Sequence, residues 1–223
     1  MASPRLTLVR HGETTGQSSV RYYGATDVPL SPAGEAQMRH AGAALAGERF
    51  AAVYSSRLCR TRRGAELVAP DHLTATPLAA FDEVDFGRWE GLTRQEIARR
   101  DPQPFAVWQA DPESFAYPDG ECRRAFHRRV AAGLAGLIAG APGEHLLLVV
   151  HRGVIAVALT ELLGLGAAER RALQIDLGSI HVLARDTDGW RAERLNYVPG
   201  PGVMTNSSAS FPRASRGRAG SGT

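Results

Sequence analysis

The sequence predicts an α/β fold, in which a mostly parallel central sheet forms the middle layer of a three-layer α/β/α sandwich. Short runs of apolar, strand-type residues recur along the chain, and segments with helical spacing separate them. The strongest runs lack polar alternation, which is typical of strands buried on both faces of a sheet. Alternation of such strands with helices indicates crossover connections between parallel strands.

Five segments have the strand pattern. Residues 6–9, 52–54 and 146–150 are short apolar runs, and the last of these is the strongest. Residues 180–184 and 191–195 flank the turn sequence Asp186-Thr-Asp-Gly189. The Asp-Gly pair favours a tight turn, so we expect the last two strands to form a hairpin.

Helix signals lie between these strands. Ser31 is a good N-cap, and Pro32 suits the first position of a helix that runs through Leu45. Residues 58–68 form a second predicted helix, and Thr93 with Glu96 forms a capping box that opens a short third. Residues 121–138 and 153–163 complete the set, the last ending at Gly164, a favourable C-cap.

The length and the cysteines bound the organisation. The chain has 223 residues, and we expect one domain over residues 1–200. Residues 201–223 are rich in Ser, Gly, Ala and Arg without periodicity, so we predict a disordered tail, with a partner-binding tail as the alternative. Cys59 and Cys122 lack ligand-type spacing, so we interpret them as free thiols.

Membrane and secretion signals are not expected. No apolar run approaches the roughly 20 residues that span a bilayer. The first five residues lead directly into a strand-like segment, which leaves no room for the apolar stretch of a signal peptide. We therefore expect a cytoplasmic protein.

All 26 basic residues are arginine. Mechanisms that need a lysine, such as Schiff-base or P-loop chemistry, are therefore excluded. An anion site must instead be built from guanidinium groups, which suit phosphate.

The net charge of +3 equals the contribution of Arg213, Arg216 and Arg218 in the tail. No basic stripe with interleaved aromatic residues occurs, so we expect no nucleic-acid partner.

The segment from Leu8 to Thr14 carries the clearest chemistry. A buried strand ends there and delivers Arg10, His11 and Gly12 to the carboxyl edge of the sheet, where ligands bind in α/β folds. The guanidinium disfavours protonation of the imidazole, and a neutral imidazole is a nucleophile. Histidine could merely cap the strand, but chance gives the string Arg-His-Gly-Glu with a probability on the order of 10⁻³.

From these residues to about Val198 the chain resembles the histidine phosphatase superfamily, in its phosphoglycerate-mutase-like branch. Arg10, His11 and Gly12 match the signature triplet of that family. Five further segments resemble its motifs and follow in the same order: residues 21–31, 54–61, 83–91, 118–121 and 149–154. The pattern is most similar to small-metabolite phosphatases of the α-ribazole phosphatase type.

The resemblance implies a role for each matched residue. His11 would attack phosphorus and become phosphohistidine, while Arg10, Arg60 and His151 would hold the phosphoryl oxygens. Glu83 would protonate the leaving oxygen and later activate water. Neither a metal nor a cofactor is expected, because the arginines supply the positive charge. Further phosphate or substrate contacts are expected from Thr14, Gln17, Arg21, Tyr23 and Gly24.

Several of these assignments have simpler alternatives. Arg60 could form a salt bridge on a helix face, and three other acids lie near Glu83: Asp82, Asp85 and Glu90. Glu121 could contact substrate or only start its helix. The five remaining histidines show no metal-type spacing, namely His40, His72, His127, His145 and His181.

Two positions depart from the family pattern. Gln17 stands where asparagine often contacts phosphate, and Arg152 follows His151 where glycine is commoner. Glutamine keeps the amide but reaches one methylene further. Arg152 could contact substrate or point to solvent.

The preferred function is hydrolysis of a small metabolite's phosphomonoester. A phosphoglycerate mutase is the runner-up, but residues 89–120 form a short cover with prolines at positions 102, 104, 112 and 118. Arg99 and Arg100 there are interpreted as solvated. A short cover leaves phosphohistidine open to water.

A non-catalytic phospho-ligand binding protein is the third option. The expected partner is a small phosphorylated metabolite, and the oligomeric state stays open, with a homodimer as one option.

Overall fold

The computed structural model describes residues 4–141 and 143–200, and its centre is a six-stranded sheet with the order β3-β2-β4-β1-β5-β6. The neighbouring pairs β3–β2, β2–β4 and β4–β1 are parallel, whereas β5 runs antiparallel to β1 and β6 antiparallel to β5. The predicted mostly parallel sheet is confirmed. The strands are β1 (Arg5–Arg10), β2 (Ala52–Ser55), β3 (Thr76–Pro77), β4 (His145–Val150), β5 (Ile180–Asp186) and β6 (Gly189–Tyr197).

The central strands β1 and β4 are buried on both faces. Leu6 and Leu8 of β1 belong to the core under one face, while Val9 packs into the core under the other. The side chains of β4 alternate in the same way, because successive residues of a strand point to opposite faces. Both faces are apolar, which explains why these strands appear in the sequence as continuous hydrophobic runs.

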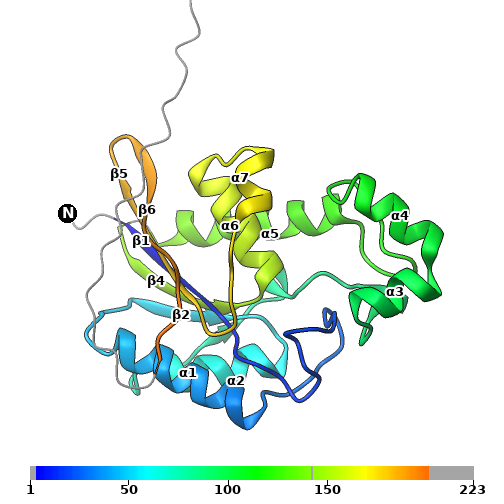
Figure 1. Ribbon diagram of the computed structural model, residues 1–223. Helices are drawn as coiled ribbons and strands as arrows, with labels where there is room; N and C mark the ends of the chain where they lie inside the picture. Colours follow the sequence, from blue (N-terminus) through cyan, green and yellow to red (C-terminus); the bar gives the residue numbers. More distant parts are fainter. Residues whose placement is uncertain (1–3, 142, 201–223) are drawn as a thin grey trace, which may run out of the picture.

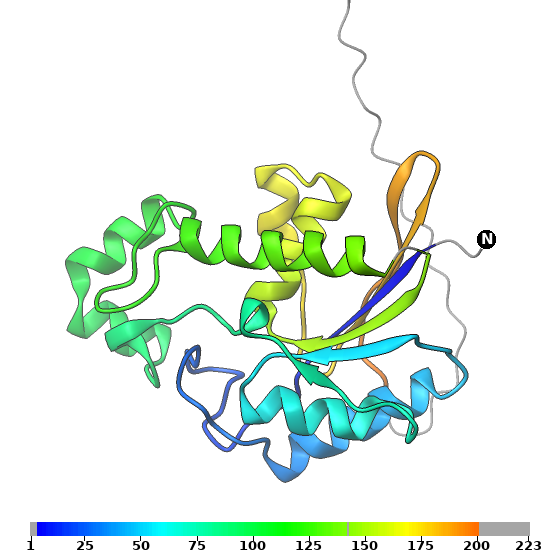
Figure 2. The ribbon, with the colours of Figure 1, turned by 180° about the vertical axis from the view of Figure 1, so that it is seen from behind.

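Helices cover both faces of the sheet (Figures 1 and 2). α1 and α2 lie on one side, and α5 and α6 lie on the other. α3 and α4 are set beside the sheet, beyond the loops at one end of its strands. The helices are α1 (Pro32–Leu45), α2 (Cys59–Val68), α3 (Arg94–Arg100), α4 (Pro102–Ala110), α5 (Arg123–Gly140), α6 (Arg152–Leu163) and α7 (Ala167–Ala172), with 3₁₀ turns η1 (Ala79–Phe81) and η2 (Gly87–Trp89).

The predicted start and stop signals are confirmed. The Ser31 hydroxyl accepts a hydrogen bond from the Gly34 amide at 3.1 Å, and Pro32 opens α1. Thr93 and Glu96 exchange both bonds of a capping box at α3. Gly164 ends α6 with a φ of 66°, a left-handed conformation that favours glycine. β5 and β6 form the predicted hairpin.

Three elements were not predicted: β3, α4 and α7. β3 is an exposed pair of residues, and neither α4 nor α7 contains a buried residue, so none shows a clear apolar pattern. The cover over residues 89–120 is therefore more helical than the sequence indicates, with Pro102 at the start of α4. α5 begins at Arg123, two residues later than expected.

Two sequence expectations concern the chain outside the core. The tail predicted for residues 201–223 lies outside the residues that the structure describes. Within the described part, none of the helices has the length and hydropathy that a membrane crossing needs.

The loop after β1 packs directly against the first turn of α1. A Cβ atom on Gly34 would lie 1.9 Å from the Glu13 carbonyl oxygen, and one on Gly12 would lie 2.3 Å from the Gly34 carbonyl oxygen. Both distances are far below van der Waals contact. Two glycines therefore allow the backbone that carries His11 to rest on the helix.

We expect Gly34→Ala to lower the free energy of unfolding by about 1–3 kcal/mol, because the new methyl group must push the two backbones apart. Gly136→Ala is the matched control, since a Cβ atom on this exposed helical glycine meets nothing within 4 Å. That control should gain up to about 1 kcal/mol from helix propensity. Urea unfolding measures both, and equal stabilisation by the two substitutions would contradict the close approach.

Candidate active site

Two histidines meet where two adjacent parallel strands end. Arg10 of β1 is paired in register with Val150 of β4, so His11 and His151 follow at the same level of the sheet. The His11 amide donates to the Val150 carbonyl at 3.0 Å. The two imidazole centroids lie 5.2 Å apart, with an angle of 67° between the ring planes. Two imidazoles 140 positions apart in the chain are thus direct neighbours in the structure.

The His11 ring is held in a nucleophilic form. Its Nδ1 lies 2.7 Å from the Gly12 carbonyl oxygen, and since that oxygen can only accept, Nδ1 carries the proton. Nε2 therefore presents a lone pair. Burial holds the pKa of His11 well below 6.5, and the charges of Arg60 and Arg10 lower it further. The imidazole is consequently neutral at neutral pH.

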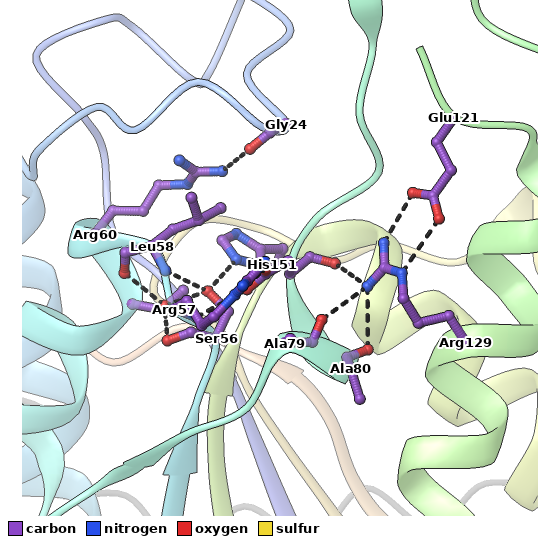
Figure 3. A network of polar contacts seen from close by, with 12 residues as sticks. Gly24, Ser56, Arg57, Leu58, Arg60, Ala79, Ala80, Glu121, Arg129 and His151 are labelled. Atoms are coloured by element: carbon purple, nitrogen blue, oxygen red, sulfur yellow. Dashed lines mark hydrogen bonds and ion pairs between the residues drawn. The ribbon is translucent and has the colours of Figure 1, made fainter.

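His151 is fully buried beside His11. Its Nε2 lies 2.8 Å from the Ser56 hydroxyl, a contact drawn in Figure 3, while its Nδ1 has no hydrogen-bond partner. Burial lowers the pKa of His151 far below its ordinary value, with Arg60 as the next cause. Ser56 was not predicted from the sequence, although it lies inside the motif at residues 54–61.

Arg60 is buried, which excludes the simple interpretation as a surface salt bridge. Its terminal nitrogens donate to backbone carbonyls, to Thr26 at 2.9 Å and to Gly24 at 2.8 Å. Figure 3 shows the bond to Gly24. Its Nε atom is buried without a partner. Burial lowers the pKa of Arg60, and no carboxylate lies within ion-pair distance among the described residues. Its positive charge is therefore available to a bound anion.

A carboxylate holds the loop that supplies those carbonyls. Glu90 accepts hydrogen bonds from the amides of Gly24, Ala25 and Thr26 at 2.9, 3.0 and 3.2 Å. The peptide groups of this loop thus lie between the Glu90 anion on their amide side and Arg60 on their carbonyl side. This binding of the loop accounts for Glu90, which the sequence left as an alternative acid.

Arg10 is held in a similar way. Its Nη1 donates to the Ile175 carbonyl at 2.8 Å, and its Nε is buried without a partner. Burial lowers the pKa of Arg10 to about 10, and the neighbouring charge of Arg152 contributes to that shift. Arg10 therefore adds a second guanidinium beside His11 that forms no salt bridge with any carboxylate in the described part of the chain.

The geometry also separates Glu83 from the nearby acids. Asp82 pairs with Arg57 at 2.6 Å, and Asp85 accepts from the Gly87 amide at 2.8 Å. Of the four acids between residues 82 and 90, only Glu83 lines a cavity together with His11. Its two carboxylate oxygens accept from the Val84 and Gly153 amides, both at 2.9 Å.

Glycine at position 153 allows this approach. A Cβ atom on Gly153 would lie 2.3 Å from Glu83 Oε1. The Glu83 carboxylate therefore rests on the first turn of α6, immediately after His151.

A second arginine network holds the segment that precedes Glu83. Arg129 Nη1 donates to the carbonyls of Ala79, Ala80 and Asp82 at 3.2, 3.2 and 3.0 Å, and its Nη2 pairs with Glu121 at 2.8 Å (Figure 3). Glu121 thus precedes α5 and binds Arg129. It lines a neighbouring cavity of about 480 Å³ rather than the one that contains His11.

The cavity at His11 has a volume of about 560 Å³. Among the predicted substrate residues, Arg21 and Tyr23 line it. Thr14 is buried and lies 2.7 Å from the Ser18 hydroxyl. The role of Gly24 in the structure is the loop contact described above. Gln17 is exposed and does not line the cavity, although its neighbours Ser18 and Ser19 do. Its contact with phosphate stays a prediction.

Much of the lining was not predicted. It includes an aromatic group, Tyr22, Phe86, Trp108 and Tyr117, and two arginines, Arg94 and Arg123. Arg152, for which the sequence left substrate contact and solvent exposure open, also lines the cavity. Within the described chain, no group of three or more His, Cys, Asp or Glu side chains has the arrangement of a metal site.

Comparison with known proteins agrees with this geometry. Residues 6–198 match the histidine phosphatase superfamily, branch 1. The chain belongs to this superfamily. It is 32% identical over 179 residues to the adenosylcobalamin/α-ribazole phosphatase of Salmonella typhimurium. The matched region covers 78% of this chain and 87% of that protein. These relatives make the protein a member of a family of phosphomonoester hydrolases.

Solved structures show the same fold. The α-ribazole phosphatase from Shigella flexneri superposes with a TM-score of 0.80 at 27% identity, covering 90% of this chain and 100% of that one. A mycobacterial glucosyl-3-phosphoglycerate phosphatase superposes with a TM-score of 0.75 at 28% identity, covering 86% and 98%. Both neighbours are phosphatases of small metabolites.

The buried histidines predict that stability falls in acid. His11 and His151 have pKa values held well below 6.5, and burial lowers that of His181 to about 4. Below about pH 6.5 the unfolded chain binds protons at these histidines, whereas the folded protein does not. Each neutral imidazole then lowers the free energy of unfolding by about 1.4 kcal/mol per pH unit as the pH falls.

Urea unfolding between pH 7 and pH 4.5 measures this slope. His181→Gln should flatten it by the contribution of one proton, because it removes one buried imidazole. His72→Gln is the control at an exposed histidine and should leave the slope unchanged. An identical slope in His181→Gln and the wild type would show that His181 is not buried as a neutral ring.

Proposed function

We propose that this protein hydrolyses the phosphomonoester of a small metabolite through a phosphohistidine at His11. The observation that carries the proposal is a set of unpaired buried nitrogens. The described residues contain four buried side-chain polar atoms without a partner, and three belong to the residues around His11: Arg10 Nε, Arg60 Nε and His151 Nδ1. Buried polar groups are almost always satisfied, so a missing partner of complementary charge is expected there. A phosphoryl group supplies the acceptor oxygens.

The first step follows from these positions. The phosphoryl oxygens accept hydrogen bonds from Arg10, Arg60 and His151, with Ser56 donating to the other nitrogen of His151. The lone pair of His11 Nε2 attacks phosphorus, and the bond from phosphorus to the leaving oxygen breaks. Glu83 gives its proton to that oxygen, so the product alcohol leaves neutral. The fixed guanidiniums stabilise the charge that develops on the phosphoryl group.

The second step releases phosphate. Glu83, now a carboxylate, takes a proton from a water molecule as that water attacks the phosphohistidine. The bond between phosphorus and Nε2 breaks, and His11 recovers its lone pair. Glu83 ends the cycle protonated, so one residue serves as acid and then as base.

We also propose the cytoplasm as the place of this activity. Cys59 and Cys122 are both free thiols in the structure, which suits a reducing compartment. A homodimer stays a prediction.

His11→Ala should lower kcat/KM for p-nitrophenyl phosphate by about 10⁴-fold or more, because no other group can form the covalent intermediate. His72→Gln should keep the wild-type value. Vanadate should inhibit the wild type and EDTA should leave it active. Full turnover by His11→Ala would eliminate this mechanism, and coupled enolase activity on 3-phosphoglycerate would favour a mutase.

Glu83→Gln should separate the two steps. Loss of the acid should lower kcat for alkyl phosphates by about 10²–10⁴-fold. With p-nitrophenyl phosphate, whose leaving group needs no proton, loss of the base should slow only the second step. Rapid mixing should then show a burst of one equivalent of p-nitrophenolate. Asp85→Asn is the control, and a burst in that variant with none in Glu83→Gln would move the role to Asp85.

A further inference from the structure

We propose that Arg94, Arg123 and Arg152 form a second anion subsite in the cavity at His11, and that the substrate carries a carboxylate or second phosphate away from the transferred phosphoryl group. The inference rests on the proposed function and narrows its substrate class. The three arginines are here called the distal arginines.

The distal arginines come from separate parts of the chain and line one cavity. Arg94 belongs to α3, Arg123 to α5 and Arg152 to α6. Within the described chain, none of them forms a salt bridge or donates a side-chain hydrogen bond to a protein acceptor. Arg21 lines the same cavity but is paired with Glu96 at 2.8 Å, so its charge is already balanced.

The charges of the cavity are unequal. Its lining contains five arginines and a single acid, Glu83. Arg10 faces the transferred phosphoryl group, and Arg21 is neutralised by Glu96. The three remaining guanidiniums line the same cavity, where Arg94 and Arg152 are exposed and Arg123 is half-buried. Like charges on one cavity wall favour binding of an anion. A phosphoryl group at His11 already has Arg10 and Arg60, so a further anion is the simplest partner for the others.

Aromatic faces hold two of the distal arginines. The guanidinium carbon of Arg94 lies 5.4 Å from the ring centroid of Trp108, and that of Arg123 lies 5.7 Å from that of Phe126. Stacking of this kind positions a guanidinium but leaves its N–H edge free to donate. The edge matches a carboxylate or phosphate, which accepts two parallel hydrogen bonds.

The charges of two distal arginines also act on residues near the reacting end of the cavity. Arg94 and Arg152 both act on the pKa of Tyr22, opposing the increase that burial causes, and Arg152 helps to lower the pKa of Arg10. The Tyr22 ring packs against Phe86 and Trp108, with centroids 5.1 and 6.5 Å away. The surface that joins the two anion positions is therefore aromatic. It suits a flat or apolar segment between the two charged groups of the substrate.

A matched set of aryl phosphates tests the subsite. 4-Propylphenyl phosphate, 4-(2-carboxyethyl)phenyl phosphate and 4-(2-phosphonoethyl)phenyl phosphate share an alkylphenol leaving group and differ in the distal charge. The wild type should prefer the charged compounds by at least about tenfold in kcat/KM, since hydrogen bonds to charged groups are stronger than those between neutral groups. The comparison of carboxylate with phosphonate identifies the preferred anion.

Substitution of the distal arginines should remove this preference. Arg152→Ala and Arg94→Ala should each reduce the ratio of charged to neutral kcat/KM by about 10-fold or more. Arg152→Lys should retain part of it, because the charge remains. Arg100→Ala, an exposed arginine outside the cavity, should leave the ratio at the wild-type value. A wild-type ratio near one, or an unchanged ratio in both alanine variants, would overturn the proposal.

A binding measurement keeps this test independent of turnover. Calorimetric titration of His11→Ala with the neutral and charged compounds should give a tighter Kd for the charged ones, and the further Arg152→Ala substitution should abolish that difference. If the wild type hydrolyses none of the compounds, the proposed function fails while the titration still decides the subsite. If it hydrolyses all of them equally and the titration shows no difference, only the subsite fails.

Discussion

The candidate site depends on how two guanidiniums are held, one of them half-buried and the other fully buried. Arg10 and Arg60 donate to the backbone carbonyls of Ile175, Thr26 and Gly24, and neither contacts a carboxylate of residues 4–141 or 143–200. A buried charge is costly unless polar groups surround it, and a carboxylate partner would have been the usual solution. Carbonyl dipoles orient the guanidiniums but leave a net positive charge. An anion that enters the cavity can therefore use that charge without first breaking an ion pair.

Much of the fold could be predicted from local patterns. The apolar runs at residues 6–9 and 146–150 occupy the middle of the sheet, where both faces are covered, and hydrophobicity alone identifies such strands. Ser31, Thr93 and Gly164 act within a few residues of themselves, so their capping roles are visible in sequence. α4 and α7 bury no residue, and their helices consequently leave no periodic pattern to detect.

The candidate site was predictable to a lesser degree. His11 and Arg10 lie together in a specific string, and resemblance supplied Arg60, His151 and Glu83. Only the structure distinguishes Glu83 from Asp82 and Glu90. Asp82 binds Arg57 and Glu90 binds the loop at residues 24–26, and these partners come from distant segments of the chain. The distal arginines are scattered among 26 arginines, and only the cavity shows that these three share a space.

The bond from the Gly153 amide to Glu83 has a mechanical consequence. Gly153 follows His151 by two residues, so the proposed proton donor is hydrogen-bonded to the same turn that carries the second imidazole. In the proposed mechanism, Glu83 acts on the leaving oxygen and His151 on the phosphoryl oxygens, which lie at opposite ends of the breaking bond. A displacement of α6 would carry both together and preserve their spacing. A structural change elsewhere in the molecule would thus move Glu83 and His151 together and leave their relative positions unchanged.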